Sequence, residues 1–247
     1  MKTTGNTILI TGGSAGIGLE MARQFVALGN KVIITGRDGE RLKKAAVELG
    51  NVTAITSDVS NAQSVEDLVN RIKTEFPELN VLVNNAGRAD VHNLADSGEK
   101  AYEIAAAEFD TNFLSVVRLT EKLLPVLKAQ KDAAIVNVSS IVAFAPAQSL
   151  PTYSASKAAL HSYTKSLRLA LRDTAVKVFE LMPPLVNTAL SAEIGGENGI
   201  PPSVLVNDLI DALNTDRFQI HTGQTEDIYR LSLANPAQAL LAMNGLS

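Results

Sequence analysis

The chain has 247 residues, of which 46% are hydrophobic and 19% are charged, and it contains no cysteine. This composition predicts one large folded domain over 1–247 and excludes disulfides and thiolate metal sites. The formal net charge of −4 includes no basic cluster, so we expect no nucleic-acid or membrane partner. The histidines are scattered, which predicts no metal site. The N-terminus has no leader-like pattern and no apolar run could span a membrane, which favours a cytoplasmic location.

Short β-branched, apolar runs alternate with longer amphipathic segments along the chain. The predicted strands cover 7–11, 31–35, 52–56, 81–85, 134–139, 176–181 and 218–222. The predicted helices cover 18–29, 64–76, 99–130, 152–173 and 203–213. Because strands and helices alternate, we predict right-handed crossovers and a single α/β domain. Its fold is a Rossmann-type, doubly wound parallel sheet of seven strands with helices on both faces.

Residue types at the segment ends add three expectations. Gly29 is expected to end the first helix. Ser64, with Asp67 three residues later, is expected to cap the helix at 64–76. The glycine- and proline-rich segment 191–202 is predicted to be a mobile loop that closes over the site.

The first predicted strand runs directly into TGGSAGIG, residues 11–18, where a helix begins. Glycines in such a turn allow a pyrophosphate to approach the backbone closely, and free N–H groups at the helix N-terminus attract the anion. The alternative is a glycine-rich turn that serves only packing. The position at the first strand–helix junction favours dinucleotide binding.

The second predicted strand ends in TGRDGERL. Gly36 stands where an acidic residue could bind the ribose hydroxyls of NAD, and Arg37 follows it. Because a guanidinium can pair with a 2′-phosphate, we predict NADP(H) rather than NAD(H). The alternative is that Arg37 is a solvated turn residue, partly neutralised by Asp38.

Several motifs, in this order, resemble those of the short-chain dehydrogenase/reductase family in its compact form. They are TGGSAGIG at 11–18, NNAG at 84–87, the asparagine of FDTNFLSVV, VNVSS at 136–140 and YSASK at 153–157. The resemblance implies a carbonyl reductase or secondary alcohol dehydrogenase that uses NADP(H). The alternatives are an NADH-preferring dehydrogenase of another small alcohol or hydroxy compound and a nucleotide-sensing protein without catalysis.

The resemblance implies a catalytic tetrad. Tyr153 is the general acid and base, Lys157 its partner and a ligand of the nicotinamide ribose, and Ser140 a donor to the substrate oxygen. Asn112 orders a water that connects Lys157 to solvent. We choose Ser140 over Ser139 because it lies 13 residues before Tyr153, the spacing typical of the family.

The residue types are consistent with these roles. Tyr153 and Lys157 share a helix face, where a cation is expected to lower the pKa of the tyrosine by up to about three units. Taken without the resemblance, the serines could instead bond the backbone at a strand end, and Asn112 could be an amide that kinks a helix.

The resemblance also assigns binding residues. Those expected at the cofactor are Gly12, Ser14, Gly16, Ile17, Gly18, Arg37, Asp58, Val59, Asn85, Ala86, Gly87, Tyr153, Lys157, Pro183, Val186 and Thr188. Those expected at the substrate are Val142, Gln148, Ser149, Leu185 and Leu190, with Ile141, Phe144 and Leu150 beside them. None is charged and most are apolar, which favours a hydrophobic or aryl ketone.

Three further expectations concern particular residues. Pro184 stands where the family usually has glycine, so the chain is expected to pass the nicotinamide by a slightly different path. His92 is predicted to be a surface residue rather than a catalyst. Apolar residues on more than one face of the helices at 99–130 and 152–173 predict a homodimer or homotetramer, as the resemblance also implies. These residues are Leu119, Leu123, Leu127, Leu160, Leu167 and Leu171.

Overall fold

The computed structural model describes residues 1–96 and 100–246. Its strands are β1 (Thr7–Thr11), β2 (Lys31–Gly36), β3 (Val52–Thr56), β4 (Val81–Asn84), β5 (Ala133–Val138), β6 (Val176–Met182) and β7 (Gln219–His221). They form one seven-stranded sheet in the order β3-β2-β1-β4-β5-β6-β7, and every neighbouring pair is parallel. The predicted fold class and all the predicted strands are confirmed.

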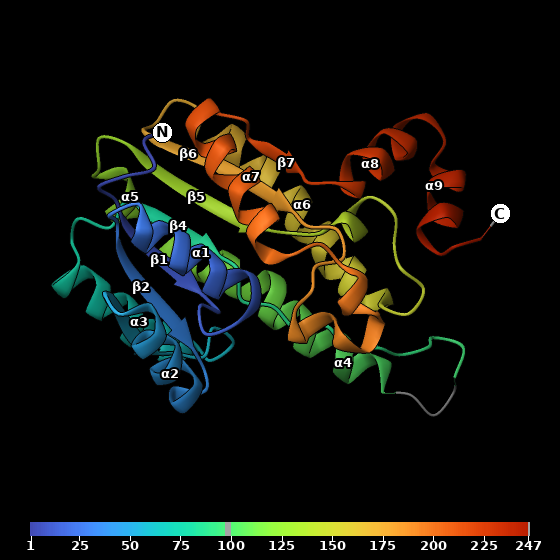
Figure 1. Ribbon diagram of the computed structural model, residues 1–247, viewed down its shortest axis with the longest axis horizontal. Coiled ribbons are helices and arrows are strands. Elements are labelled where there is room, and N and C mark those ends of the chain that lie inside the picture. The colour runs from blue at the N-terminus through green and yellow to red at the C-terminus, as the bar shows by residue number, and fades with distance from the viewer. Residues whose placement is uncertain (97–99, 247) are drawn as a thin grey trace.

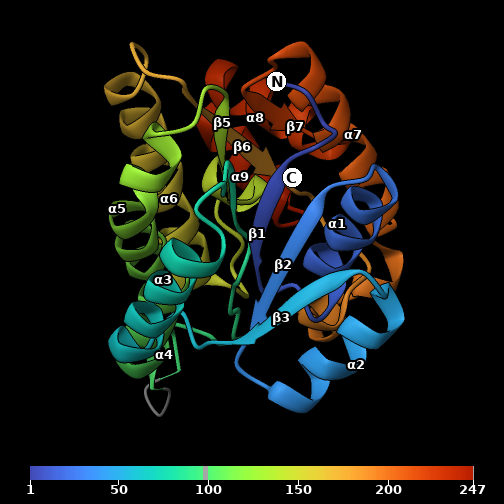
Figure 2. The same cartoon turned by 90° about the vertical axis from the view of Figure 1, so that its left-hand side faces the viewer.

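Helices cover both faces of the sheet (Figure 2). One face carries α1 (Gly16–Ala27), α2 (Gly39–Leu49) and α7 (Pro202–Thr215). The other carries α3 (Ala62–Glu75), α4 (Ala101–Phe109), α5 (Ser115–Lys128) and α6 (Pro151–Ala170). Two C-terminal helices, α8 (Gln224–Ala234) and α9 (Pro236–Met243), lie together beyond β7 at one end of the molecule (Figure 1).

The strands are apolar on successive residues because both faces of the sheet are covered. In β1, Ile8 and Ile10 belong to the core cluster under α1 and α7, whereas Leu9 belongs to the cluster under α3 and α5. The strand order reverses between β1 and β4, whose neighbours β2 and β5 lead outward in opposite directions. In open parallel sheets, ligands bind at the carboxyl ends of the strands at such a point.

The helix predicted at 99–130 is wrong in detail. Residue 99, where that prediction begins, lies outside the described residues. Beyond it the structure has α4, then a π-helix η1 (Asp110–Leu114), then α5. The π-helix widens the turn at Asn112, and such turns are frequent at functional sites.

Of the two predicted helix ends, the glycine that ends α1 is confirmed and the N-cap of α3 is wrong. Gly29 directly follows the C-cap of α1 with φ +77°, and its N–H donates to the carbonyl of Val26, as expected for a terminating glycine. The predicted cap at Ser64 is wrong, because the side chain of Asn61 accepts from the backbone N–H of Ser64 and caps α3. The Ser64 hydroxyl instead accepts from the backbone N–H of Asp58.

The segment 191–202 contains regular structure. It holds most of η3 (Ala189–Ile194), all of η4 (Gly196–Asn198) and the start of α7, and Ile200 forms a parallel bridge with Val186. Its mobility remains a prediction. Within the part of the chain that the structure describes, no helix combines the length and the apolar character needed to cross a lipid bilayer.

Candidate active site

The glycine-rich turn between β1 and α1 is tight, and its backbone segments approach closely where a side chain would not fit. Gly12 has φ +67°, and a Cβ on Gly18 would lie 2.4 Å from the Gly12 carbonyl oxygen. Helix α1 begins at Gly16 without a side-chain cap and without an acidic residue in its first turn. Its first N–H groups therefore have no capping side chain and can bind an anion. Ile17, in that first turn, packs against the core.

The chain after β4 fixes this turn. The Asn85 amide donates to the carbonyls of Thr11 at 2.9 Å and Gly12 at 3.3 Å. The Thr11 hydroxyl oxygen accepts from the backbone N–H groups of Asn85 and Ala86, both at 3.0 Å. The side chain of Asn85, which was predicted to contact the cofactor, therefore supports the turn in this structure.

A pocket of about 210 Å³ opens at the carboxyl ends of β1, β2 and β4. The predicted cofactor residues in its lining are Gly12, Ser14, Arg37, Asp58, Val59, Ala86 and Gly87. Sequence reasoning missed Arg41, Arg88 and Thr111, which also line it. Arg41 lies in the first turn of α2 and Arg37 directly precedes the N-cap Asp38, so the signal available in the sequence was a second arginine close to Arg37.

Arg37 and Arg41 at this pocket are exposed, and among the described residues neither is in an ion pair, whereas Arg88 pairs with Asp90. The Asp38 carboxylate caps α2 by accepting from the backbone N–H of Arg41 at 3.0 Å. This carboxylate therefore accepts from the helix backbone, whereas the alternative interpretation had it partly neutralise Arg37. Two guanidinium groups next to a glycine-rich turn suit the charge of a 2′-phosphate.

Beside the pocket, β5 and α6 bring the predicted tyrosine, lysine and serine together. The Lys157 ammonium donates to the Val138 carbonyl at 2.8 Å and lies 5.5 Å from the centroid of the Tyr153 ring. The Ser140 hydroxyl accepts from the backbone N–H of Val142 at 3.4 Å, and its interaction with the Tyr153 phenol lowers the pKa of that phenol. The Ser139 hydroxyl is buried without a hydrogen-bond partner among the described residues. Of the two serines, Ser140 is the one that acts on the phenol, and its role toward the substrate remains a prediction.

The pKa values of the tyrosine and lysine are displaced by burial. Burial raises the pKa of Tyr153 to about 12; the Ser140 hydrogen bond opposes the rise and the Glu108 carboxylate adds to it. Burial lowers the pKa of Lys157 to about 8, against the attraction of Glu180. The expected fall in the tyrosine pKa is not found, because the ammonium lies over the ring and is bound to a carbonyl while desolvation dominates.

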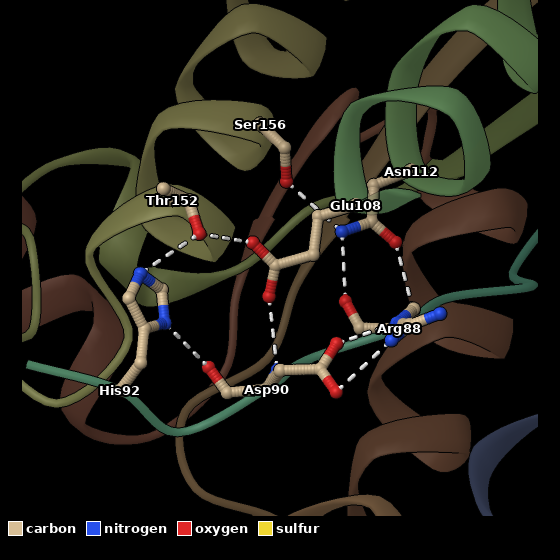
Figure 3. Close-up of polar contacts among 7 residues, drawn as sticks. All are labelled: Arg88, Asp90, His92, Glu108, Asn112, Thr152 and Ser156. Atoms are coloured by element: carbon tan, nitrogen blue, oxygen red, sulfur yellow. Dashed lines mark hydrogen bonds and ion pairs between the residues drawn. The ribbon is translucent and has the colours of Figure 1, made fainter. Parts of the chain in front are cut away.

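The predicted Asn112 is buried in the π-helix, and both the oxygen and the nitrogen of its side-chain amide form hydrogen bonds (Figure 3). Its Oδ1 accepts from the backbone N–H of Arg88 at 2.8 Å. Its Nδ2 donates to the Arg88 carbonyl and to the Ser156 hydroxyl, both at 2.9 Å. The amide therefore ties the segment after β4 to α6. Its role in ordering a water remains a prediction.

The loop after β6 folds back over the glycine-rich turn. The Pro183 carbonyl accepts from the backbone N–H of Ile141 at 2.9 Å, and Val186 is buried. A Cβ on Gly16 would lie 3.2 Å from the methyl carbon of Thr188. Thr188 thus reaches the glycine-rich turn with Pro184 in place of the usual glycine.

The predicted substrate residues differ in burial. Val142 is buried, Leu185 is partly buried, and Gln148, Ser149 and Leu190 are exposed. The backbone N–H of Gln148 donates at 2.7 Å to the Asn244 side chain, which ties the C-terminus to the segment before α6. Phe144 packs against the rings of His161, His221 and Tyr229, a cluster that β7 and α8 help to form.

The prediction that His92 is a surface residue is wrong. His92 is 5% exposed, and its Nδ1 lies 3.0 Å from the Asp90 carbonyl oxygen. Glu108, which sequence reasoning missed, is fully buried one helical turn before Asn112. No group of three or more histidine, aspartate or glutamate side chains within 1–96 and 100–246 is arranged to hold a metal.

Comparison with known proteins gives the family. The sequence model of the short chain dehydrogenases matches residues 6–199, and the chain belongs to that family. It is 39% identical over 249 residues to the uncharacterized oxidoreductase DltE of Bacillus subtilis, covering 99% of this chain and 98% of that protein. It is 35% identical over 180 residues to the NADP-dependent 3-hydroxy acid dehydrogenase YdfG of Salmonella typhi, covering 72% of each.

A solved structure agrees with the fold. The short chain dehydrogenase of Burkholderia cenocepacia, crystallised in complex with NADP, superposes with a TM-score of 0.86 at 26% sequence identity. The match covers 98% of both chains. The protein is therefore an oxidoreductase of the short-chain dehydrogenase/reductase family, as the motifs implied.

Proposed function

We propose that this chain is an NADPH-dependent carbonyl reductase that interconverts a ketone and a secondary alcohol. One observation carries the proposal: the Tyr153 phenol, the Ser140 hydroxyl and the Lys157 ammonium meet beside a pocket that suits a dinucleotide. The cofactor, when bound, supplies a hydride to the carbonyl carbon.

The residues of the chain act on the carbonyl oxygen. Ser140 donates a hydrogen bond to it and so stabilises the charge that develops as the C=O double bond breaks. Tyr153 gives its phenolic proton to the same oxygen, which completes the alcohol. Lys157 attracts the resulting phenolate and holds the cofactor ribose. In the oxidation direction, the phenolate takes the proton from the alcohol.

The preference for NADPH rests on the two arginines at the pocket. Arg37 and Arg41 can both reach toward a 2′-phosphate, and Asp38 is engaged as a helix cap. The relative YdfG is named as NADP-dependent, and the Burkholderia cenocepacia structure holds NADP. The substrate class rests on the uncharged, mainly apolar residues expected to line its site, which suit a hydrophobic or aryl ketone.

The test is a panel of ketones and alcohols assayed with NADPH, NADH, NADP and NAD. The panel includes aryl ketones, aliphatic ketones and 3-oxo acids, since YdfG is named for 3-hydroxy acids. We expect reduction of an apolar ketone with NADPH, and loss of turnover with retained cofactor binding in Tyr153→Phe. If Tyr153→Phe keeps the kcat of the natural chain, the proposed role of the phenol is wrong.

A further inference from the structure

A buried cluster joins α4, α6 and the segment after β4, and the reaction proposed above does not use it (Figure 3). The fully buried Glu108 lies on one side and His92 on the other. The Thr152 hydroxyl lies between them, hydrogen-bonded to Glu108 Oε2 and 3.4 Å from His92 Nε2. Thr152 directly precedes Tyr153 in α6, and the Glu108 carboxylate acts on the pKa of the Tyr153 phenol.

The outer contacts of the cluster fix two of its hydrogen positions. The backbone N–H of Asp90 donates to Glu108 Oε1 at 2.9 Å, so that carboxyl oxygen is an acceptor. The Asp90 carbonyl oxygen lies 3.0 Å from His92 Nδ1. A carbonyl can only accept, so Nδ1 carries a hydrogen.

The inner contacts need one proton more than the Thr152 hydroxyl has. A hydrogen bond on each side of its oxygen requires two protons, and the hydroxyl supplies one. The second proton comes either from a protonated Glu108 carboxyl or from a protonated Nε2 of His92. In the first arrangement the histidine is neutral, and in the second an imidazolium faces a carboxylate across the hydroxyl.

We propose that Glu108, Thr152 and His92 form a relay that shares one proton, and that the position of this proton sets the charge beside the reacting tyrosine. These three are positioning residues, because they act through Tyr153 and do not touch the reacting atoms. The proposal rests on the proposed function, since it concerns the protonation of the tyrosine that serves as acid and base.

The charge on Glu108 affects the pKa of Tyr153. After burial, the Glu108 carboxylate contributes to the raised pKa of Tyr153. Transfer of the shared proton from His92 to Glu108 removes the negative charge of the carboxylate and the positive charge of the imidazolium together. Glu108, and not His92, is among the groups that act on the phenol, so the loss of the carboxylate charge decides the sign and lowers the pKa of Tyr153. The relay therefore couples the protonation of His92, through Thr152 and Glu108, to the pKa of Tyr153.

The side chains of the other charged residues around the relay form no hydrogen bond with Glu108, Thr152 or His92 among the described residues. On the segment after β4, the Asp90 carboxylate pairs with the Arg88 guanidinium and raises its pKa. On α6, Lys157 lies over the Tyr153 ring. On β6, Glu180 attracts Lys157. Within the described residues, none of these side chains hydrogen-bonds Glu108, Thr152 or His92 through its charged group.

Glu108→Gln tests the relay with little change in shape. The amide oxygen can accept from Asp90, and the amide N–H can donate to Thr152, which then donates to a neutral His92. All the hydrogen bonds are kept but no proton can move. We expect the fall of kcat/KM for ketone reduction at high pH to shift to lower pH by about half to one unit. Glu103→Gln is the control, because it removes the same charge from an exposed position of α4.

Nitrogen NMR of labelled histidine reads the relay without turnover. In Glu108→Gln we expect His92 to keep the neutral form with a hydrogen on Nδ1 alone, whereas in the natural chain the Nε2 signal should show a share of the relay proton. If the glutamine variant does not fold, Thr152→Val and Thr152→Ser replace it. The valine should move the pH profile, and the serine, which restores the hydroxyl, should return it.

The outcomes separate the relay from the proposed function. A shift in Glu108→Gln that is absent in Glu103→Gln supports the relay. An unmoved pH profile, or a His92 signal that is identical in the natural chain and Glu108→Gln, overturns it. If no carbonyl compound is turned over, the proposed function fails, and the His92 signals alone decide whether a proton is shared.

Discussion

Lys157 is an amine held in a buried site, and this predicts how stability depends on pH. Its pKa is about 8 in the folded protein, against an ordinary value of 10.5, because burial disfavours the charged form. Between these values the unfolded chain binds more protons, so the free energy of unfolding should rise with pH. From about pH 7 to about pH 9.5 the expected rise is about 2 kcal/mol.

Urea unfolding of the natural chain and of Lys157→Met at the two pH values measures this contribution. The difference in free energy of unfolding between the two proteins should change by that amount. Tyr153 does not interfere, because its pKa of about 12 affects stability only above the ordinary value of 10. A difference that is constant with pH contradicts a depressed lysine pKa.

Arg37 and Arg41 predict the choice of cofactor. Arg37→Ala should raise KM for NADPH about tenfold or more and leave KM for NADH nearly unchanged, because a charge-assisted hydrogen bond to the 2′-phosphate is lost. Arg41→Ala should act in the same direction. Lys43→Ala is the control, since Lys43 is exposed on the same helix and does not line the pocket. An unchanged NADPH to NADH ratio in Arg37→Ala would show that Arg37 only faces solvent.

At the scale of elements, α3 should depend on its cap. Asn61 accepts from the backbone N–H of Ser64, so Asn61→Ala should lower the free energy of unfolding by about 1 kcal/mol. Asn61→Asp keeps an acceptor at this position and should lose little stability. Thermal or urea unfolding checks both variants. Equal losses in the two would mean that the cap contributes nothing.

The strands could be predicted from sequence because each is a short, continuous apolar run, which only a sheet covered on both faces requires. The break at Asn112 was raised only as the alternative that this amide kinks a helix, and the sequence alone could not decide it. It depends on the bonds of that side chain to Arg88 and Ser156, residues that only the fold brings near. Helices α2, α8 and α9 were also missed.

Within the candidate site, the same distinction holds. Tyr153, Lys157 and Ser140 could be proposed because the resemblance to the family motifs names them by their positions in the sequence. The burial of His92 was not foreseen, because it requires Thr152 and Glu108 to arrive from two other elements. A lone histidine in a polar stretch carries no sign of such partners.

At the scale of the whole molecule, the structure weakens the evidence from which a homodimer or homotetramer was predicted. Five of the leucines used for it are buried in the single chain and Leu167 packs against the core there, so they need no second subunit. Leu169 on α6 is 63% exposed and Leu114 in the π-helix is 48% exposed. These are the apolar side chains that a bundle of α5 and α6 with a second copy could still cover.

Light scattering at micromolar concentration tests the assembly. We expect a mass of two or four chains, against 26.2 kDa for one. Leu169→Glu should shift the mass toward one chain, because a buried charge opposes the contact. Leu233→Glu on α8, where the side chain is 69% exposed, is the control and should not. A single-chain mass for the natural protein at every concentration rules the bundle out.

The central claim is that the sheet, the glycine-rich turn and α6 together hold a cofactor and a ketone for hydride transfer, with Tyr153 as the acid. The most direct measurement follows deuterium from NADPH labelled at the transferring position into the alcohol product by mass spectrometry. The account predicts one deuterium on the former carbonyl carbon with the natural chain and no labelled alcohol with Tyr153→Phe. Alcohol formed without deuterium, or equal labelling with Tyr153→Phe, would contradict it.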